Sequence, residues 1–215
     1  MKRVGIVGGL GPETCCEFLL AVNREIEQKM GCQADVVMEN VAMPHNEMKK
    51  LAAGSFSTFH KDILAGAISR LHAAQVDFIV IPCNTMHIFI DDLRKISKIP
   101  IVSIIDETAK ECLQQQITKV GILGSSTTIQ QKLHETKLHS IGIETVIPSR
   151  EDQSEMGEII PRIIFEQNTK EDEQTIVSII RKMKIEGADA VILGCTDLPL
   201  VINEQNSVLP IIDTR

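Results

Sequence analysis

The sequence predicts an α/β protein built from two similar halves, each with a parallel sheet covered by helices. Short apolar runs alternate with stretches of helical periodicity along all 215 residues. One run begins at Asp77 and is followed by Cys83, and another begins at Asp189 and is followed by Cys195. The two cysteines are 112 residues apart, and so are the two aspartates. This repeat predicts that each half presents one cysteine where a strand ends.

The first half reads as strands and helices in alternation, because β-branched runs are separated by apolar residues at helical spacing. The glycine-rich residues 8–12 form a turn that lets the backbone approach a bound group closely. Residues 42–56 contain Pro44 and Gly54, so we expect a loop or a short helix over the strand ends. We expect strands at 2–8, 35–41, 78–82 and 101–105, and helices at 13–30, 58–75 and 87–96.

The second half repeats this alternation. Pro161 lies inside a helical pattern and should kink that helix or start a new one. We expect strands at 119–124, 143–147 and 210–213 and in the run before Cys195, and helices at 127–140, 153–167 and 172–186. We place the crossing between halves near Pro100 with a return near Val208. Residues 1–99 and 208–215 would then form the first half, and residues 100–207 the second.

The composition argues against several classes of function. The net charge of −7 disfavours non-specific binding to nucleic acid, and the absence of Trp and Tyr leaves little material for base stacking. No apolar run is long enough to span a membrane, and the chain enters its first strand directly, so we expect no membrane segment and no signal peptide.

The six cysteines include no C-x-x-C pair, so we expect reduced thiols and a cytoplasmic protein. Neither the cysteines nor the six histidines have the close spacing of metal ligands, so we expect no metal. The first glycine turn is similar to a dinucleotide fingerprint, but Thr14 occupies the third glycine position. A glycine loop lining a small pocket is therefore the favoured interpretation.

Cys83 and Cys195 are the candidate reactive groups. Each follows an apolar strand and precedes a helix start, which should lower the thiol pKa from about 8.5. Buried cysteines are otherwise often inert, small apolar residues. Two like groups facing one pocket from related halves suit a reaction that acts on both faces of one atom.

Polar residues follow the same strand ends and could bind a carboxylate, cap a helix or do both. They are Asn84, Thr85, Ser125, Thr128 and Thr196. His87 could face the pocket or be a packed structural residue. Asp197 could orient the second thiol or be a first-turn acid favoured by the helix dipole.

Three stretches together carry a resemblance to a known family. They are Cys83-Asn84-Thr85-Met86-His87, Gly194-Cys195-Thr196-Asp197 and Gly8-Gly9-Leu10-Gly11-Pro12. The chain resembles the aspartate/glutamate racemase family over essentially its whole length, most of all the aspartate racemase branch. The resemblance implies two pseudo-symmetric flavodoxin-like domains with the active site in the cleft between them, a homodimer, and an amino acid as substrate.

The resemblance also implies roles for residues. Cys83 and Cys195 would be the two catalytic bases of a reaction that uses neither pyridoxal phosphate nor a metal. Asp197 would be an auxiliary residue beside Cys195. The implied substrate-binding residues are Leu10, Asn46, Asn84, Thr85, Ser125, Thr128 and Thr196.

The sequence departs from the family pattern in ways that bear on the substrate. Asp197 stands where Glu is usual, Asn46 stands where aspartate racemases carry an arginine, and a lysine expected around Phe165 and Glu166 is not evident. Family members usually continue for one more helix beyond the position of Arg215. Two alternatives therefore stay open: a related isomerase of the hydantoin racemase or maleate isomerase kind, and a small-metabolite binding protein without catalysis.

Overall fold

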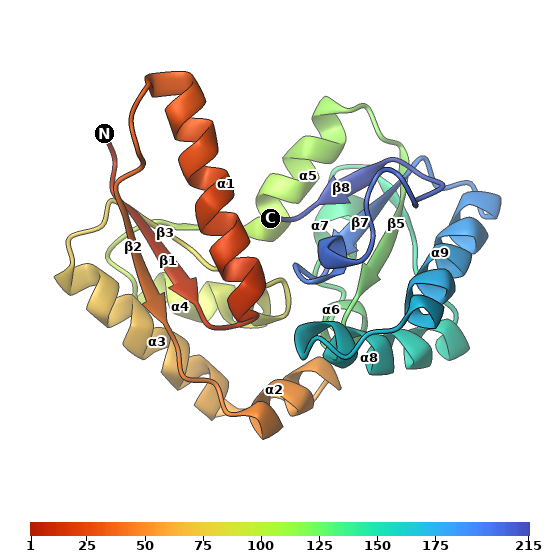
Figure 1. Cartoon of the computed structure of the whole chain (residues 1–215), viewed down its shortest axis with the longest axis horizontal. Helices are drawn as coiled ribbons and strands as arrows, with labels where there is room; N and C mark the ends of the chain where they lie inside the picture. The colour runs from red at the N-terminus through yellow and green to blue at the C-terminus, as the bar shows by residue number, and fades with distance from the viewer.

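The structure is a computed structural model that describes residues 1–215, with the side chain of residue 52 excepted (Figure 1). It consists of two halves, each built around a four-stranded parallel sheet with helices packed against it. The strand orders, β2-β1-β3-β4 and β6-β5-β7-β8, are equivalent when counted along each half. The predicted α/β class with two similar parallel halves is thus confirmed.

The first half carries its strands and helices in the predicted alternation. Its elements are β1 (Val4–Gly8), α1 (Pro12–Met30), β2 (Val36–Asn40), α2 (His45–Ala52), α3 (Thr58–Ala73), β3 (Phe78–Val80), η1 (Thr85–Phe89), α4 (Ile90–Ile96) and β4 (Ile101–Val102). Of the loop or short helix expected over the strand ends, the structure has a helix, α2, which begins directly after Pro44.

The second half starts with α5 and ends with the last strand of the chain. Its elements are α5 (Ile104–Gln114), β5 (Lys119–Gly124), α6 (Ser126–Gln130), α7 (Glu135–Ser140), β6 (Glu144–Val146), α8 (Arg150–Ile164), α9 (Lys170–Ile185), β7 (Ala190–Gly194), η2 (Leu198–Leu200) and β8 (Ile211–Asp213). No helix in the described part of the chain is both long and apolar enough to cross a membrane.

Strand pairing differs from the predicted exchange of segments between the halves. β4 pairs with β3 in the first sheet, although residues 101–102 were expected to open the second half. β8 pairs with β7 in the second sheet, although residues 208–215 were expected to return to the first. The chain therefore crosses once, between β4 and α5, where the Ser103 hydroxyl caps α5 by accepting a bond from the N–H of Asp106.

Several predicted elements have different bounds in the structure, and three differences are the clearest. The strand expected at 101–105 ends at Val102 because the cap at Ser103 starts a helix. The helix expected at 127–140 is divided into α6 and α7, and Lys132 between them has a positive φ of 52°. α8 continues through Pro161 as one helix rather than ending or restarting there.

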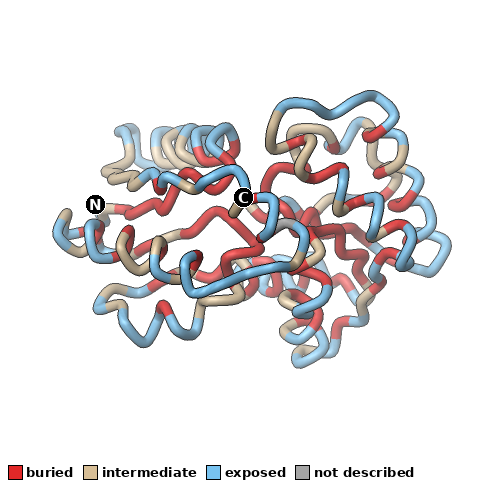
Figure 2. Tube along the Cα trace, turned by 90° about the horizontal axis from the view of Figure 1, so that it is seen from below, coloured by how far each residue is buried: buried red, intermediate tan, exposed pale blue. Residues whose placement is uncertain are grey.

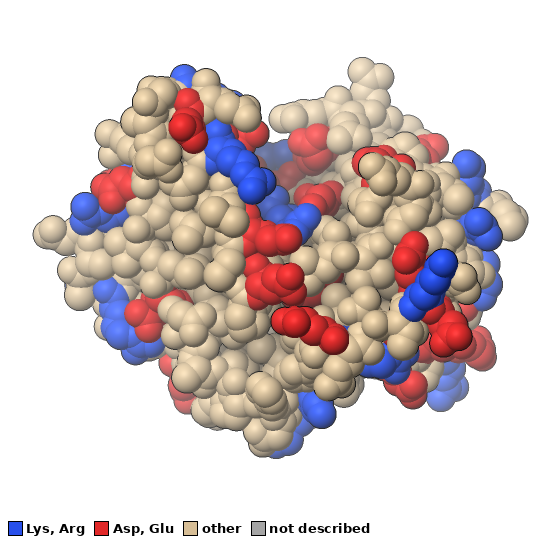
Figure 3. Space-filling view, in the orientation of Figure 1, with Lys and Arg blue, Asp and Glu red and all other residues tan. Residues whose placement is uncertain are grey.

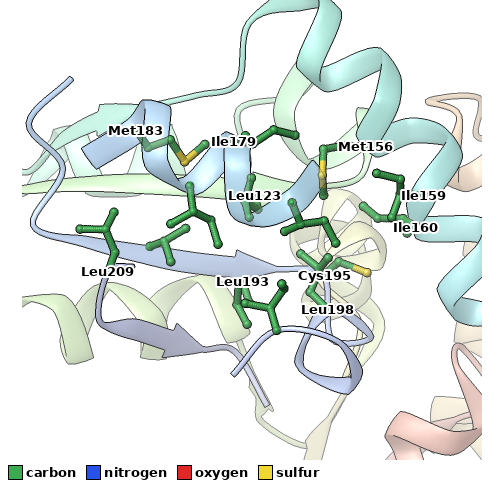
Figure 4. Close-up of a cluster of buried hydrophobic side chains, with 14 of the residues drawn as sticks. Leu123, Met156, Ile159, Ile160, Ile179, Met183, Leu193, Cys195, Leu198 and Leu209 are labelled. Carbon is green, nitrogen blue, oxygen red and sulfur yellow. The ribbon is translucent and has the colours of Figure 1, made fainter. Parts of the chain in front are cut away.

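Each sheet has an apolar core: all residues of β1 and β7, and all of β5 but Lys119, are buried. Figure 2 shows buried segments running through the interior of both halves. In the second half, isoleucines and methionines of α8 and α9 pack on one face of β5 and β7 (Figure 4). Cys195 follows β7 and lies at the end of this cluster, next to Leu198 and Ile160. The packing of this cluster thereby fixes the end of β7 and the position of Cys195, which follows it.

Candidate active site

A small cavity lies where the carboxyl ends of the two sheets face each other. It holds about 20 Å³, and the strand ends, the α1 turn and the helices α2 and α8 enclose it. Its lining residues are Leu10, Met48, Leu51, Cys83, Asn84, Thr85, Ser125, Ile160, Ile164, Cys195, Thr196 and Asp197. The carboxyl ends of parallel strands are where ligands bind in open α/β sheets.

Eight of the ten site residues predicted from the sequence line this cavity. Thr128 lies behind the lining, with its hydroxyl 3.1 Å from that of Ser125. Asn46 does not line the cavity: its side chain is exposed and donates a hydrogen bond to Glu47. Four lining residues were not predicted: Met48, Leu51, Ile160 and Ile164 are apolar residues of α2 and α8, whose sequences show only the pattern of ordinary amphipathic helices.

Cys83 is positioned by the turn that ends the β3 segment. Burial raises the pKa of its thiol to about 12, although the backbone N–H groups of Met86 and Thr85 act in the opposite direction. The expectation that the helix start lowers this pKa is therefore wrong for the buried thiol. The backbone amides lower the thiol pKa, as predicted, but the loss of water on burial raises it by more.

Cys195 has a carboxylate beside its thiol. Its Sγ donates to Asp197 Oδ2 at 3.6 Å, and burial together with the Asp197 charge holds the thiol pKa well above its ordinary value. Burial also raises the pKa of Asp197. The Cys83 charge adds to the shift at Cys195, which is expected for two thiols that share one site.

The glycine turn of the first half holds Asp197 of the second half. The Thr14 hydroxyl, fully buried at the start of α1, donates to Asp197 Oδ1 at 2.6 Å. Gly11 has a φ of 129°, and a Cβ there would lie 2.6 Å from the same oxygen. Glycine at this position therefore leaves room for the carboxylate, and the turn and Thr14 together aim its other oxygen at Cys195.

Asn84 is bonded to the opposite half through both ends of its amide. Its Nδ2 donates to Thr214 Oγ1 at 2.7 Å, and its Oδ1 lies 2.8 Å from His134 Nε2. Because burial lowers the pKa of His134 to about 3, the ring is neutral and Nε2–H is the donor. His134 Nδ1 has no hydrogen-bond partner among the described residues. His134 and Thr214 were missed by sequence reasoning, which had no signal for contacts across the cleft.

The remaining polar lining also joins the halves. The hydroxyls of Thr85 and Ser125 are 2.9 Å apart, and the Thr196 hydroxyl donates to the carbonyl of Pro82 at 3.2 Å. These groups are buried and can exchange their partners across the cleft for a polar ligand between them.

His87 is a structural residue that supports the Cys83 turn. Its Nδ1 lies 2.9 Å from the carbonyl of Cys83, and its Nε2 accepts from the N–H of Ile104 at 3.0 Å. Burial lowers the pKa of this imidazole to about 4, so it is neutral and donates through Nδ1–H. It connects the first cysteine to the start of α5.

Charge is concentrated on the surface rather than in the cavity. On the face drawn in Figure 3, both acidic and basic side chains border the hollow between the halves. Asp197 is the charged residue of the cavity lining. Among the described residues, no group of three or more His, Cys, Asp or Glu side chains is arranged to hold a metal ion.

Similarity to a known protein family covers nearly the whole chain. The sequence model of the Asp/Glu/hydantoin racemase family matches residues 7–215, which include both cysteines and all the cavity-lining residues. The chain belongs to the Asp/Glu/hydantoin racemase family. It is 28% identical over 224 residues to the broad specificity amino-acid racemase RacX of Bacillus subtilis, covering 98% of this chain and 92% of RacX.

Solved structures of this racemase family have the same two-domain fold. The aspartate racemase of Picrophilus torridus superposes with a TM-score of 0.82 at 27% identity, covering all of this chain and 89% of that one. An aspartate racemase homologue from Pyrococcus horikoshii gives a TM-score of 0.78 at 30% identity, covering all of this chain and 94% of that one.

Proposed function

We propose that the chain is a cofactor-independent amino-acid racemase that moves the Cα proton between Cys83 and Cys195. The observation that carries the proposal is that one thiol from each half lines the same buried cavity. Hydroxyl groups line it beside the thiols, which suits a small polar substrate. Membership of the racemase family and the similarity to RacX and to aspartate racemase agree with this reaction.

The reaction is a two-step proton transfer. The Cys83 thiolate takes the Cα proton from one face, an S–H bond forms, and the electron pair of the Cα–H bond moves toward the substrate carboxylate. The Cys195 thiol gives its proton to the opposite face and becomes the thiolate. For the other enantiomer the two cysteines exchange roles, so they titrate as one pair.

Stabilising the carbanion requires hydrogen-bond donors that are already in place. In our proposal the hydroxyls of Thr85 and Thr196 bind the substrate carboxylate and amino group, and Ser125 and Thr128 support Thr85 from behind. Asn84 lines the same wall, but its amide is already bonded to His134 and Thr214. Its role is therefore to position the wall.

Asp197 is proposed to set the protonation of Cys195. A thiol with a raised pKa needs a proton acceptor before it can act as a base, and the carboxylate oxygen at 3.6 Å is one. The positively charged ammonium group of the substrate would favour a thiolate at either cysteine. A cavity of about 20 Å³ has room for about one water, so its walls must move to admit the substrate.

The test is exchange of the α-proton of L- and D-amino acids in heavy water, measured by NMR alongside racemisation. Cys83→Ala and Cys195→Ala should each abolish racemisation, while either variant can retain exchange from one enantiomer. The control is Cys112→Ala, since Cys112 is buried in the core of the second half and does not line the cavity. Full racemisation by either active-site variant, or no exchange by the wild type, would overturn the proposal.

A further inference from the structure

The wall of the cavity formed by α2 and α8 is apolar. Met48 and Leu51 project from α2, Ile160 and Ile164 from α8, and Leu10 adds to them from the glycine turn. The two helices are in contact across the boundary between the halves, and Figure 1 shows them together below the strand ends. The polar lining residues come instead from the strand ends, where the cysteines are.

The basic side chains near this wall contact groups outside the cavity. On α2, Lys50 pairs with Glu47 at 2.7 Å, and Lys49 is exposed with its Nζ 5.5 Å from the centre of the Phe165 ring. On α8, Arg162 pairs with Asp172 at 2.6 Å. None of these cations lines the cavity.

The charged group that does line the cavity has the wrong sign for an acidic side chain. Asp197 would repel a second carboxylate, and its own oxygens already face Thr14 and Cys195. Asp197 therefore belongs to the end of the cavity where the cysteines lie, near the place of the substrate amino group. An aspartate side chain against the α2–α8 wall would lose its water without gaining a cation.

We infer that the substrate is an amino acid with an aliphatic side chain, of the leucine and methionine class, which packs between α2 and α8. The inference rests on the proposed racemase function and names the substrate class of the same site. Apolar side chains on both helices give the substrate side chain dispersion contacts and exclude water. Ile164 stands beside the region where the resemblance implied a lysine, and it presents an aliphatic side chain to the cavity.

The first experiment compares kcat/KM of the wild-type protein for α-proton exchange with leucine, methionine, aspartate, glutamate, asparagine, lysine and arginine. Leucine or methionine should exceed the acidic and basic amino acids by about tenfold or more. Equal or better activity with aspartate or lysine would overturn the inference and leave the racemase proposal intact. Exchange with no amino acid at all would overturn both.

The second experiment installs a cation in the wall. Ile164→Lys should lower kcat/KM for methionine and raise it for aspartate, which changes their ratio by about ten- to a hundredfold. The control is Ile185→Lys, which makes the same substitution at the exposed end of α9, where 85% of the residue is accessible. An unchanged ratio in folded Ile164→Lys protein would overturn the inference, whatever the wild-type preference.

Discussion

Replacing Thr14 with Val should destabilise the protein in a way that depends on pH. The substitution removes the hydroxyl that donates to Asp197 Oδ1 at 2.6 Å, and both residues are buried. A hydrogen bond to a charged group contributes about 1.5–3 kcal/mol, and burial leaves little water to replace it. We therefore expect the free energy of unfolding at neutral pH to fall by about that amount, lowering Tm by roughly 2–4 °C per kcal/mol.

The pH dependence follows from the direction of the Asp197 pKa. Burial raises it, so the ionised carboxylate costs the folded state stability at neutral pH, and this cost is relieved as pH falls through the folded pKa. The Thr14 hydroxyl lowers the cost, and its loss should raise the pKa further. The difference between Thr14→Val and wild type should thus be largest at neutral pH and shrink as Asp197 becomes protonated.

Urea denaturation at neutral pH and at about pH 4.5, near the usual range of Asp, measures both effects. Thr14→Ser keeps the donor and serves as the matched control, and it should retain most of the stability. An equal loss for the Ser and Val variants, or a Val effect that is the same at both pH values, would refute the argument.

Two further predictions concern the support of the site and its chemistry. His134→Phe should lower the free energy of unfolding by about 1–3 kcal/mol, because Asn84 Oδ1 loses its buried donor, whereas His134→Gln can restore it; urea denaturation giving wild-type stability for the Phe variant would contradict this. The purified protein should show no pyridoxal absorbance and should keep its racemase activity in EDTA, because the proposed acid and base are the two thiols; a loss of activity that added zinc restores would count against the mechanism.

The α/β architecture could be predicted from the sequence because the patterns that indicate it are local and occur in both halves. The apolar runs before Cys83 and Cys195 share length and context, and a parallel sheet brings their ends to one edge. The assignment of β4 and β8 was wrong because each is a very short apolar segment that would fit either sheet. Partner choice for such strands depends on where the chain crosses, and the chain crosses after β4, where Ser103 caps α5.

The candidate site was predictable only in part, because the sequence describes local segments and not the contacts between them. Residues that follow a strand, such as Thr85 and Thr196, are placed by the strand itself. Ile164 and Met48 depend instead on how α8 and α2 meet across the boundary, which periodicity does not describe. The thiol pKa values were predicted in the wrong direction because a sequence shows a helix start but not the loss of water around it.

We expect the hydrogen bonds across the cleft to link substrate entry to the proposed chemistry of the thiols. Thr14 with Asp197, and Thr85 with Ser125, join the halves at the cavity itself. Opening exchanges such bonds for bonds to water, so each costs only about 0.5–1.5 kcal/mol, or about 1.5–3 kcal/mol where a carboxylate is involved. Opening also returns water to Cys83, which removes the main cause of its raised pKa and favours the thiolate. A substrate whose charged groups then bond to both halves favours closure again. Thiolate formation and substrate capture are therefore expected to belong to the same opening and closing motion.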